Sequence, residues 1–215
     1  MTKNRTARAL AVAAAVGPVA YIVLTIVLGL QWDGYNPLRD TQSELGAVDS
    51  PYRHVMNVGG FMALGVWILA FAAAYAMVLR RSWVKTLVAV LLVVAGVGMI
   101  VVGFFPCDAG CVDVTRTGRL HGLWSAPGAF GLSAAAMISS QVFRLDGRFS
   151  TPWQFASFWG GALSLAIGPV VGADLLPEWN GLLQRSGMWL AILWMAAVSA
   201  RLAYLAGQTV TRSDS

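Results

Sequence analysis

Two carboxylates and a histidine are the residues best suited to proton chemistry. Glu44 lies in the segment Thr-Gln-Ser-Glu-Leu-Gly at 41–46, and Asp108 stands upstream of His121, close enough in sequence for a contact across a loop. A carboxyl group at a dry interface can hold a raised pKa and donate a proton, and an imidazole can accept one. We therefore predict Asp108 and Glu44 as catalytic acids and His121 as the base or orienting group. The structural alternatives are a helix cap with a solvated acid and a hydrogen-bonded, non-catalytic histidine.

A second set of polar and aromatic side chains is suited to binding a substrate. Arg185 ends the segment Gly-Leu-Leu-Gln-Arg at 181–185, where its guanidinium could contact phosphate, pair with Glu44 or Asp108, or reach lipid headgroups. Aromatic faces can stabilise a cation, although packing and interfacial anchoring are the commoner roles of membrane tryptophans. The predicted substrate-binding residues are Ser43, Asn57, Trp67, Trp124, Trp159 and Arg185.

The chain has two cysteines, Cys107 and Cys111, on either side of Asp108. Outside the cytoplasm thiols are oxidised, so we predict a small disulfide loop. Three residues separate the thiols, which excludes a Cys-x-x-Cys redox motif. A zinc site is not predicted, because the four-ligand Cys/His spacing is missing, and no cofactor is expected.

These residues must be positioned by membrane-spanning helices. Hydrophobic residues make up 57% of the 215 positions and charged residues 12%, about half the charged share of ordinary soluble domains. A spanning helix needs about 20 apolar residues, and the period-2 alternation of a barrel is absent. We predict an all-α, polytopic six-helix bundle forming one domain over 1–215, with spans at about 9–30, 55–79, 86–105, 123–143, 153–173 and 187–206.

The distribution of basic residues predicts the orientation of this bundle. Ten of the 15 Lys and Arg residues flank the termini and the two short loops, and five lie on the other side. The positive-inside rule then places both termini in the cytoplasm of a multi-pass cell-membrane protein, with most acidic residues outside. The first span is longer than a signal-peptide core and no cleavage site follows it, so we expect it to be retained.

Several short motifs follow one another along the chain: Ser-Glu-Leu-Gly at 43–46, Asn57, Gly60, Phe105-Pro106, Asp108, His121 and Gly-Leu-Leu-Gln-Arg at 181–185. In this order they resemble the family of membrane proteins known as domain of unknown function 998. The resemblance covers nearly the whole chain and implies six helices and a candidate residue set, but no reaction. The Cys107/Cys111 pair is not part of what the resemblance implies.

The first functional hypothesis is an intramembrane enzyme with an outward-facing polar pocket. An acid and aromatic faces would suit proton-initiated cyclisation or isomerisation of a lipid or isoprenoid, as in membrane terpene cyclases. The metal-binding acid clusters of terpene synthases are not visible in the sequence. Hydrolysis through Ser43 is a variant that lacks the Gly-x-Ser-x-Gly elbow.

The alternative is a non-enzymatic accessory protein that binds a lipid or a partner at the outer face. Arg116, Arg119 and Arg185 would then contact phosphate. A transporter is disfavoured because charges are nearly absent from the middle of the spans. Nucleic-acid binding is excluded because the basic residues flank the membrane. The oligomeric state is not determined by the sequence.

Overall fold

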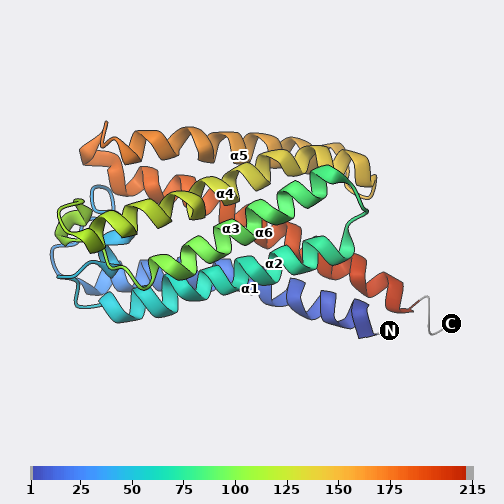
Figure 1. Cartoon of the computed structure of the whole chain (residues 1–215), viewed down its shortest axis with the longest axis horizontal. Coiled ribbons are helices and arrows are strands. Elements are labelled where there is room, and N and C mark those ends of the chain that lie inside the picture. Colours follow the sequence, from blue (N-terminus) through green and yellow to red (C-terminus); the bar gives the residue numbers. More distant parts are fainter. Residues whose placement is uncertain (1, 212–215) are drawn as a thin grey trace.

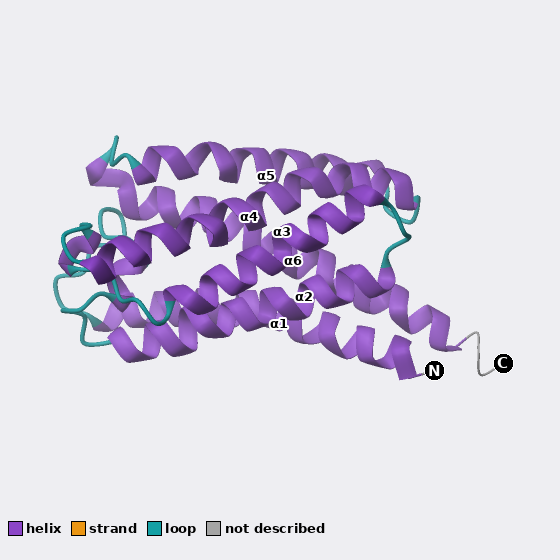
Figure 2. Cartoon of the chain, viewed as in Figure 1, coloured by secondary structure: helices purple, strands orange, loops and turns teal. Residues whose placement is uncertain are grey.

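Within residues 2–211, which the computed structural model describes, six long helices run up and down the molecule (Figure 1). No strand occurs in this part of the chain (Figure 2). The helices are α1 (Thr2–Gln31), the π-helical segment η2 (Val55–Met62) continuing into α2 (Ala63–Val78), α3 (Trp83–Val102), α4 (Arg116–Asp146), α5 (Thr151–Gly172) and α6 (Asn180–Thr211). The three longer connections contain the short turns η1 (Ser43–Gly46), η3 (Ala109–Cys111) and η4 (Pro177–Trp179).

The connections of the bundle divide between its two ends (Figure 1). The start of α1, the end of α6 and the two short connections α2–α3 and α4–α5 lie at one end, which we call the terminal end. The connections α1–η2, α3–α4 and α5–α6 lie at the opposite end, which we call the loop end. The three polar segments discussed in the sequence analysis therefore all lie at the loop end, namely 41–46, 107–111 and 181–185.

The bundle has the surface of a membrane protein. Val16, Val66 and Leu163 are each more than half exposed on the flanks of their helices, where a lipid solvent covers apolar side chains without cost. The prediction of an all-α membrane bundle is confirmed. Five helical stretches are long and apolar enough to span a bilayer: Lys3–Gln31, Val55–Val78, Trp83–Val102, Thr151–Gly172 and Pro177–Gln208.

The remaining long helix, α4, is the least apolar of the described helices. It was predicted as a span at 123–143 and is longer, with 31 residues or about 46 Å. It packs along both α3 and α5, and buries glycines and serines such as Gly128, Ser133 and Ser139. These small and hydroxyl side chains make α4 less apolar. A helix of this composition is tolerated because the side chains face other helices rather than lipid.

The helices extend beyond the predicted spans at most ends. α1 begins at Thr2 rather than 9 and α6 at Asn180 rather than 187, because backbone hydrogen bonding continues past the apolar stretch. α3 begins at Trp83, where the Ser82 hydroxyl accepts from the Lys85 amide at 3.1 Å. It ends three residues before the predicted 105. Arg212 and Asp214, part of the predicted charge distribution, lie outside the described residues.

Small residues let neighbouring helices approach closely. A Cβ on Gly65 of α2 would lie 2.5 Å from the Gly96 carbonyl oxygen of α3, so no larger side chain fits that crossing. Between α4 and α5 the hydroxyls of Ser133 and Ser164 are 2.7 Å apart, and Ser164 also donates to the Gly187 carbonyl of α6. Close packing and interhelical hydrogen bonds of this kind hold helices together in lipid.

Candidate functional site at the loop end

The first connection is docked on the start of α6. The Gly181 amide donates to the Arg39 carbonyl and the Leu182 amide to the Leu38 carbonyl, both at 2.9 Å. The first turn of any helix has amides without helical partners, and here the connection supplies them. Gly181 is required at this position because a Cβ would collide with the carbonyl oxygen of Asp40.

Arg185 holds the same connection from inside the bundle. Its side chain is 7% exposed and donates to the carbonyls of Pro37 at 2.6 Å and Asp40 at 2.9 Å, and to the Tyr35 hydroxyl. The guanidinium also lies 5.4 Å from the centre of the Tyr35 ring. The pairing with Glu44 or Asp108, one of the alternatives raised from the sequence, is not formed: the donors of Arg185 reach two backbone oxygens and a tyrosine hydroxyl, which the sequence does not mark.

A glutamine pair, missed in the sequence, links segment 41–46 to α6. Gln42 is 1% exposed, and its backbone amide donates to the Gln184 side-chain oxygen at 2.7 Å. The Gln42 side-chain oxygen accepts from the Trp189 indole at 3.2 Å. Gln184 in turn donates to the Ser43 hydroxyl at 3.4 Å, so Ser43 is bonded to α6. The occurrence of both glutamines within the two motifs was the available signal.

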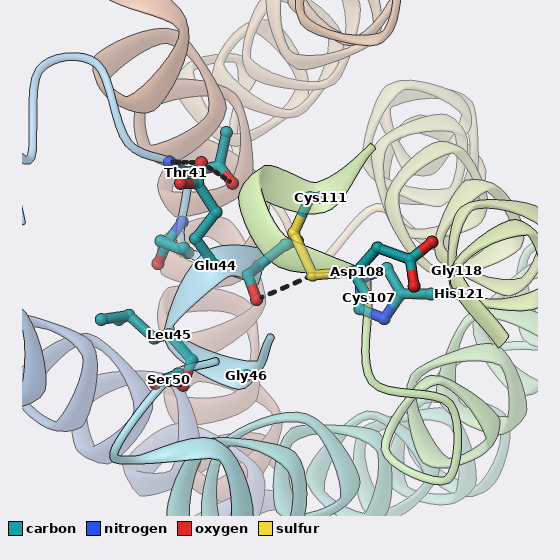
Figure 3. The surroundings of a disulfide bond; sticks show 12 residues. Thr41, Glu44, Leu45, Gly46, Ser50, Cys107, Asp108, Cys111, Gly118 and His121 are labelled. Carbon is teal, nitrogen blue, oxygen red and sulfur yellow. Dashed lines mark hydrogen bonds between the residues drawn. A yellow bond between two sulfur atoms is a disulfide. The ribbon is translucent and has the colours of Figure 1, made fainter. Parts of the chain in front are cut away.

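Glu44 is engaged within its own turn. Its carboxylate accepts from the Thr41 amide at 2.8 Å and from the Thr41 hydroxyl at 3.0 Å, which is the acidic half of a capping box. Half-burial raises the pKa of Glu44 above its ordinary value, although the hydrogen bonds from Thr41 act in the opposite direction. Figure 3 shows the carboxylate turned toward Thr41, away from Asp108 and His121.

Asp108 organises the entry into α4. It accepts from the Thr115 amide at 2.7 Å, the Thr115 hydroxyl at 2.7 Å and the Val114 amide at 3.0 Å. These hydrogen bonds, those from Thr115 first, hold the pKa of Asp108 below its ordinary value. Thr115 also caps α4 by accepting from the Gly118 amide at 3.1 Å. An ionised carboxylate with three donors is a poor proton donor, so this geometry favours the structural alternative.

The predicted disulfide between Cys107 and Cys111 is present and closes a small loop (Figure 3). Cys107 also contacts the first connection. The Cys107 carbonyl accepts from the Val48 amide at 3.0 Å, and Cys107 Sγ lies 3.4 Å from the Ser43 carbonyl oxygen. A disulfide sulfur has no hydrogen to donate, so the second contact is one of packing. Both contacts hold segment 107–111 against the first connection.

His121 has one ring nitrogen fixed and one without a partner. Nδ1 lies 2.7 Å from the Phe105 carbonyl, which can only accept, so Nδ1 carries the proton and Nε2 presents a lone pair. The side chain is 4% exposed, and Nε2 is buried with no hydrogen-bond partner in the described part of the chain. The predicted contact with Asp108 is not among its hydrogen bonds, because the carbonyl of Phe105 takes its donor.

Asn57, on the π-helical segment η2, is in a similar state. Its amide nitrogen donates to the Gly46 and Arg53 carbonyls, both at 2.8 Å, while its side-chain oxygen is buried without a partner in the described chain. Phe61 connects it to the histidine. The ring of Phe61 packs edge-on against His121 at 5.9 Å, and a Cβ on Gly46 would lie 3.0 Å from both Phe61 and Asn57. The two unpartnered acceptors thus border the same phenylalanine.

The three predicted tryptophans do not gather at the loop end. Trp159 is 56% exposed on α5, beside Phe155 and Phe158, and faces the surroundings of the bundle. Trp67 fills the space over Gly17 of α1, and Trp124 packs against the hydrophobic core. The exposed ring of Trp159 thus lies on an outer face of the bundle, apart from the polar residues with which it was predicted to line a pocket.

A family model described as "Protein of unknown function (DUF998)" matches residues 15–201. The chain belongs to the DUF998 family. No curated protein and no solved structure matches the chain. The motifs that suggested DUF998 turn out to be partners: 41–46 and 181–185 bind each other, and Asn57 and His121 border one ring. No three His, Cys, Asp or Glu side chains come close enough to hold a metal ion among the described residues.

Proposed function

We propose that this DUF998 protein binds the polar end of a hydroxyl-bearing lipid at the loop end of its bundle. The observation that carries the proposal is the pair of buried acceptors, His121 Nε2 and Asn57 Oδ1, which have no partner within residues 2–211. A buried polar group without a hydrogen bond costs about 1–3 kcal/mol. Both atoms accept hydrogens, so the ligand must donate them, as a hydroxyl group does.

The position of the acceptors favours a lipid over a soluble ligand. Asn57 lies at the start of the second apolar stretch and His121 in the second turn of α4, near the depth where headgroups meet hydrocarbon. Asn57 and Phe61 also lie on the π-helical segment Val55–Met62. π-helical turns are rare and frequently mark functional sites.

Binding is preferred over acid catalysis because the three charged residues predicted for the site form hydrogen bonds within the fold. Asp108 has three donors, Glu44 faces Thr41, and Arg185 is occupied by two carbonyls and a hydroxyl. Among the predicted site residues, His121 and Asn57 each keep one acceptor atom without a partner in the described chain, and such a pair can recognise a donor without proton transfer.

The test compares two ligands that differ in a single hydrogen-bond donor. Purified protein in detergent is titrated with dioleoylglycerol or with its 3-O-methyl ether, and adducts are quantified by native mass spectrometry. We expect the free hydroxyl to bind about 3- to 10-fold more tightly, the equivalent of one neutral hydrogen bond. Equal binding of the two ligands would exclude recognition of a donor at this site.

A matched pair of variants assigns the effect to His121. His121→Asn keeps a nitrogen that donates to the Phe105 carbonyl but removes the acceptor at Nε2, so the preference for the hydroxyl should disappear. Ser125→Ala, one turn further along α4, removes a hydroxyl bonded to the His121 carbonyl and should leave the preference unchanged.

A second candidate function is proton transfer to or from an isoprenoid or other lipid, with His121 as base. It is favoured by the tautomer of His121, in which an anchored Nδ1–H orients a free Nε2. Mass spectrometry of lipophilic extracts should then show a product in cells with the wild-type protein that is lost with His121→Gln. The Asp108→Asn variant, if folded, should retain the product, because Asp108 bonds to Val114 and Thr115 in the loop and not to the substrate. Identical extracts with and without the protein would contradict this candidate.

A further inference from the structure

The terminal end of the bundle has a surface groove that runs along α1 and continues between α1 and α6, far from the loop end. Two adjoining open depressions of about 720 and 380 Å³ share Arg8 and Val12. Among the described residues, the larger depression is lined by α1 alone, through Arg5, Arg8, Ala9, Val12 and Ala13. The smaller one lies between the two helices and is lined by Arg8 and Val12 of α1 and by Ala203, Tyr204, Gly207 and Gln208 of α6. Within residues 2–211, the lining thus combines two guanidinium groups with small and apolar side chains and contains no carboxylate.

The two arginines are available to a ligand. Arg5 and Arg8 are exposed, stand three positions apart on one face of α1, and have no hydrogen bond or ion pair in the described residues. Arg201, which lies beside Tyr204 of the groove, already has partners within the chain. Arg201 packs against the Tyr204 ring at 5.1 Å and donates to the Arg148 carbonyl.

The apolar part of the groove begins where the charges end. Ala9, Val12 and Ala13 follow Arg8 along α1 toward the middle of the bundle, and Val12 is 48% exposed. On α6, Gly207 lies beside the arginine: a Cβ there would be in ordinary van der Waals contact with Arg8, 3.9 Å from its Nε. The groove is therefore basic at its outer end and apolar toward the middle of the membrane, as a phospholipid is acidic at one end and apolar at the other.

We propose that this groove binds an anionic phospholipid, with its phosphate between Arg5 and Arg8 and an acyl chain along Ala9, Val12 and Ala13. Guanidinium groups form charge-assisted, often bidentate hydrogen bonds to phosphate oxygens. Basic pockets between transmembrane helices are a recurring type of headgroup site. The apolar continuation commits the occupant to a lipid rather than a free phosphate ion. The site is separate from Asn57 and His121, so either proposal can fail alone.

The experiment measures lipid selectivity with native mass spectrometry. Protein in a non-ionic detergent is titrated with phosphatidylglycerol or phosphatidylcholine of identical acyl chains, with and without millimolar inorganic phosphate. We expect tighter binding of phosphatidylglycerol, and a loss of about 30-fold in that affinity in Arg5→Gln/Arg8→Gln, the effect of removing two basic groups beside an anionic lipid. Gly207→Leu, which fills the hollow, should weaken binding of both lipids.

Arg81→Gln is the matched control, since Arg81 is exposed at the same end but outside the groove. It should leave the affinity for phosphatidylglycerol unchanged. Equal affinity for the two lipids overturns the proposal, as does an Arg81→Gln effect as large as that of the double variant. Displacement of phosphatidylglycerol by inorganic phosphate also overturns it, because the site would then bind a free anion. If the double variant does not fold, Arg8→Gln alone carries the same comparison.

Discussion

Two carboxylates at the loop end have opposite electrostatic surroundings. Asp108 accepts hydrogen bonds from Thr115 and Val114 that stabilise its charge, whereas half-burial of Glu44 disfavours the charged form. Of the two, Glu44 is the one whose environment favours holding a proton. Each difference is measurable as a dependence of stability on pH.

For Asp108 we predict a loss of stability in acid. Because its folded-state pKa lies below the ordinary value of 3.8, its contribution is present above that pH and is lost as pH falls through the lowered pKa. Thermal unfolding of the detergent-solubilised protein between about pH 2 and 7 should show this decline. Asp108→Asn should be less stable at neutral pH and show a flatter decline. An unchanged acid limb in the variant would contradict the role in the loop.

For Glu44 the dependence of stability on pH has the opposite sign. Its raised folded-state pKa means that its contribution is complete below the ordinary value of 4.5 and is lost as pH rises through the raised pKa. The oxygen of a glutamine can still accept from Thr41. We therefore expect Glu44→Gln to be as stable as wild type or slightly more so at pH 7, and equal to it near pH 4, by the same unfolding measurement. A marked loss of stability at pH 7 would show that the charge itself is needed.

At the scale of elements, the joint between the first connection and α6 depends on backbone contact. Gly181→Ala places a Cβ against the Asp40 carbonyl, and such overpacking costs about 1–3 kcal/mol. We predict a lower unfolding temperature and faster proteolysis in the first connection, read by mass spectrometry of the fragments. Gly160→Ala on α5 is the control, since nothing lies within 4 Å of its Cβ position. It should be neutral or stabilise the helix by up to about 1 kcal/mol.

The helices could be predicted from the sequence because each depends mainly on a local property, the length of an apolar stretch. The length of each apolar stretch determined the spans, and their alternation placed Glu44, Asp108, His121 and Arg185 at one end of the bundle. Their partners were not predictable, because Arg185 binds carbonyls far away in the chain and every residue has a carbonyl. Thr115 was missed although a threonine just before a helix is a cap signal. Its second bond, to Asp108, has no sequence signature.

For the whole molecule, the charge distribution predicts that the loop end faces outward and the termini face the cytoplasm. The native cysteines can test this. Intact cells treated with a membrane-impermeant reductant and then an impermeant maleimide should label the wild type, mainly at the half-exposed Cys111. The variant with both Cys107 and Cys111 changed to serine should not be labelled. Labelling of the wild type only after lysis would reverse the orientation.

The low hydropathy of α4 has a consequence for how the protein is made. A segment that is not apolar enough to leave the translocon unaided requires helices already in the bilayer to bury its serines and glycines. α3 precedes it in synthesis and α5 follows, and α4 packs along both. A nascent chain truncated directly after α4 should therefore fail to integrate that helix stably, and integration should recover once α5 is included. Stable integration of α4 would then depend on both neighbours, including the one that is synthesised after it.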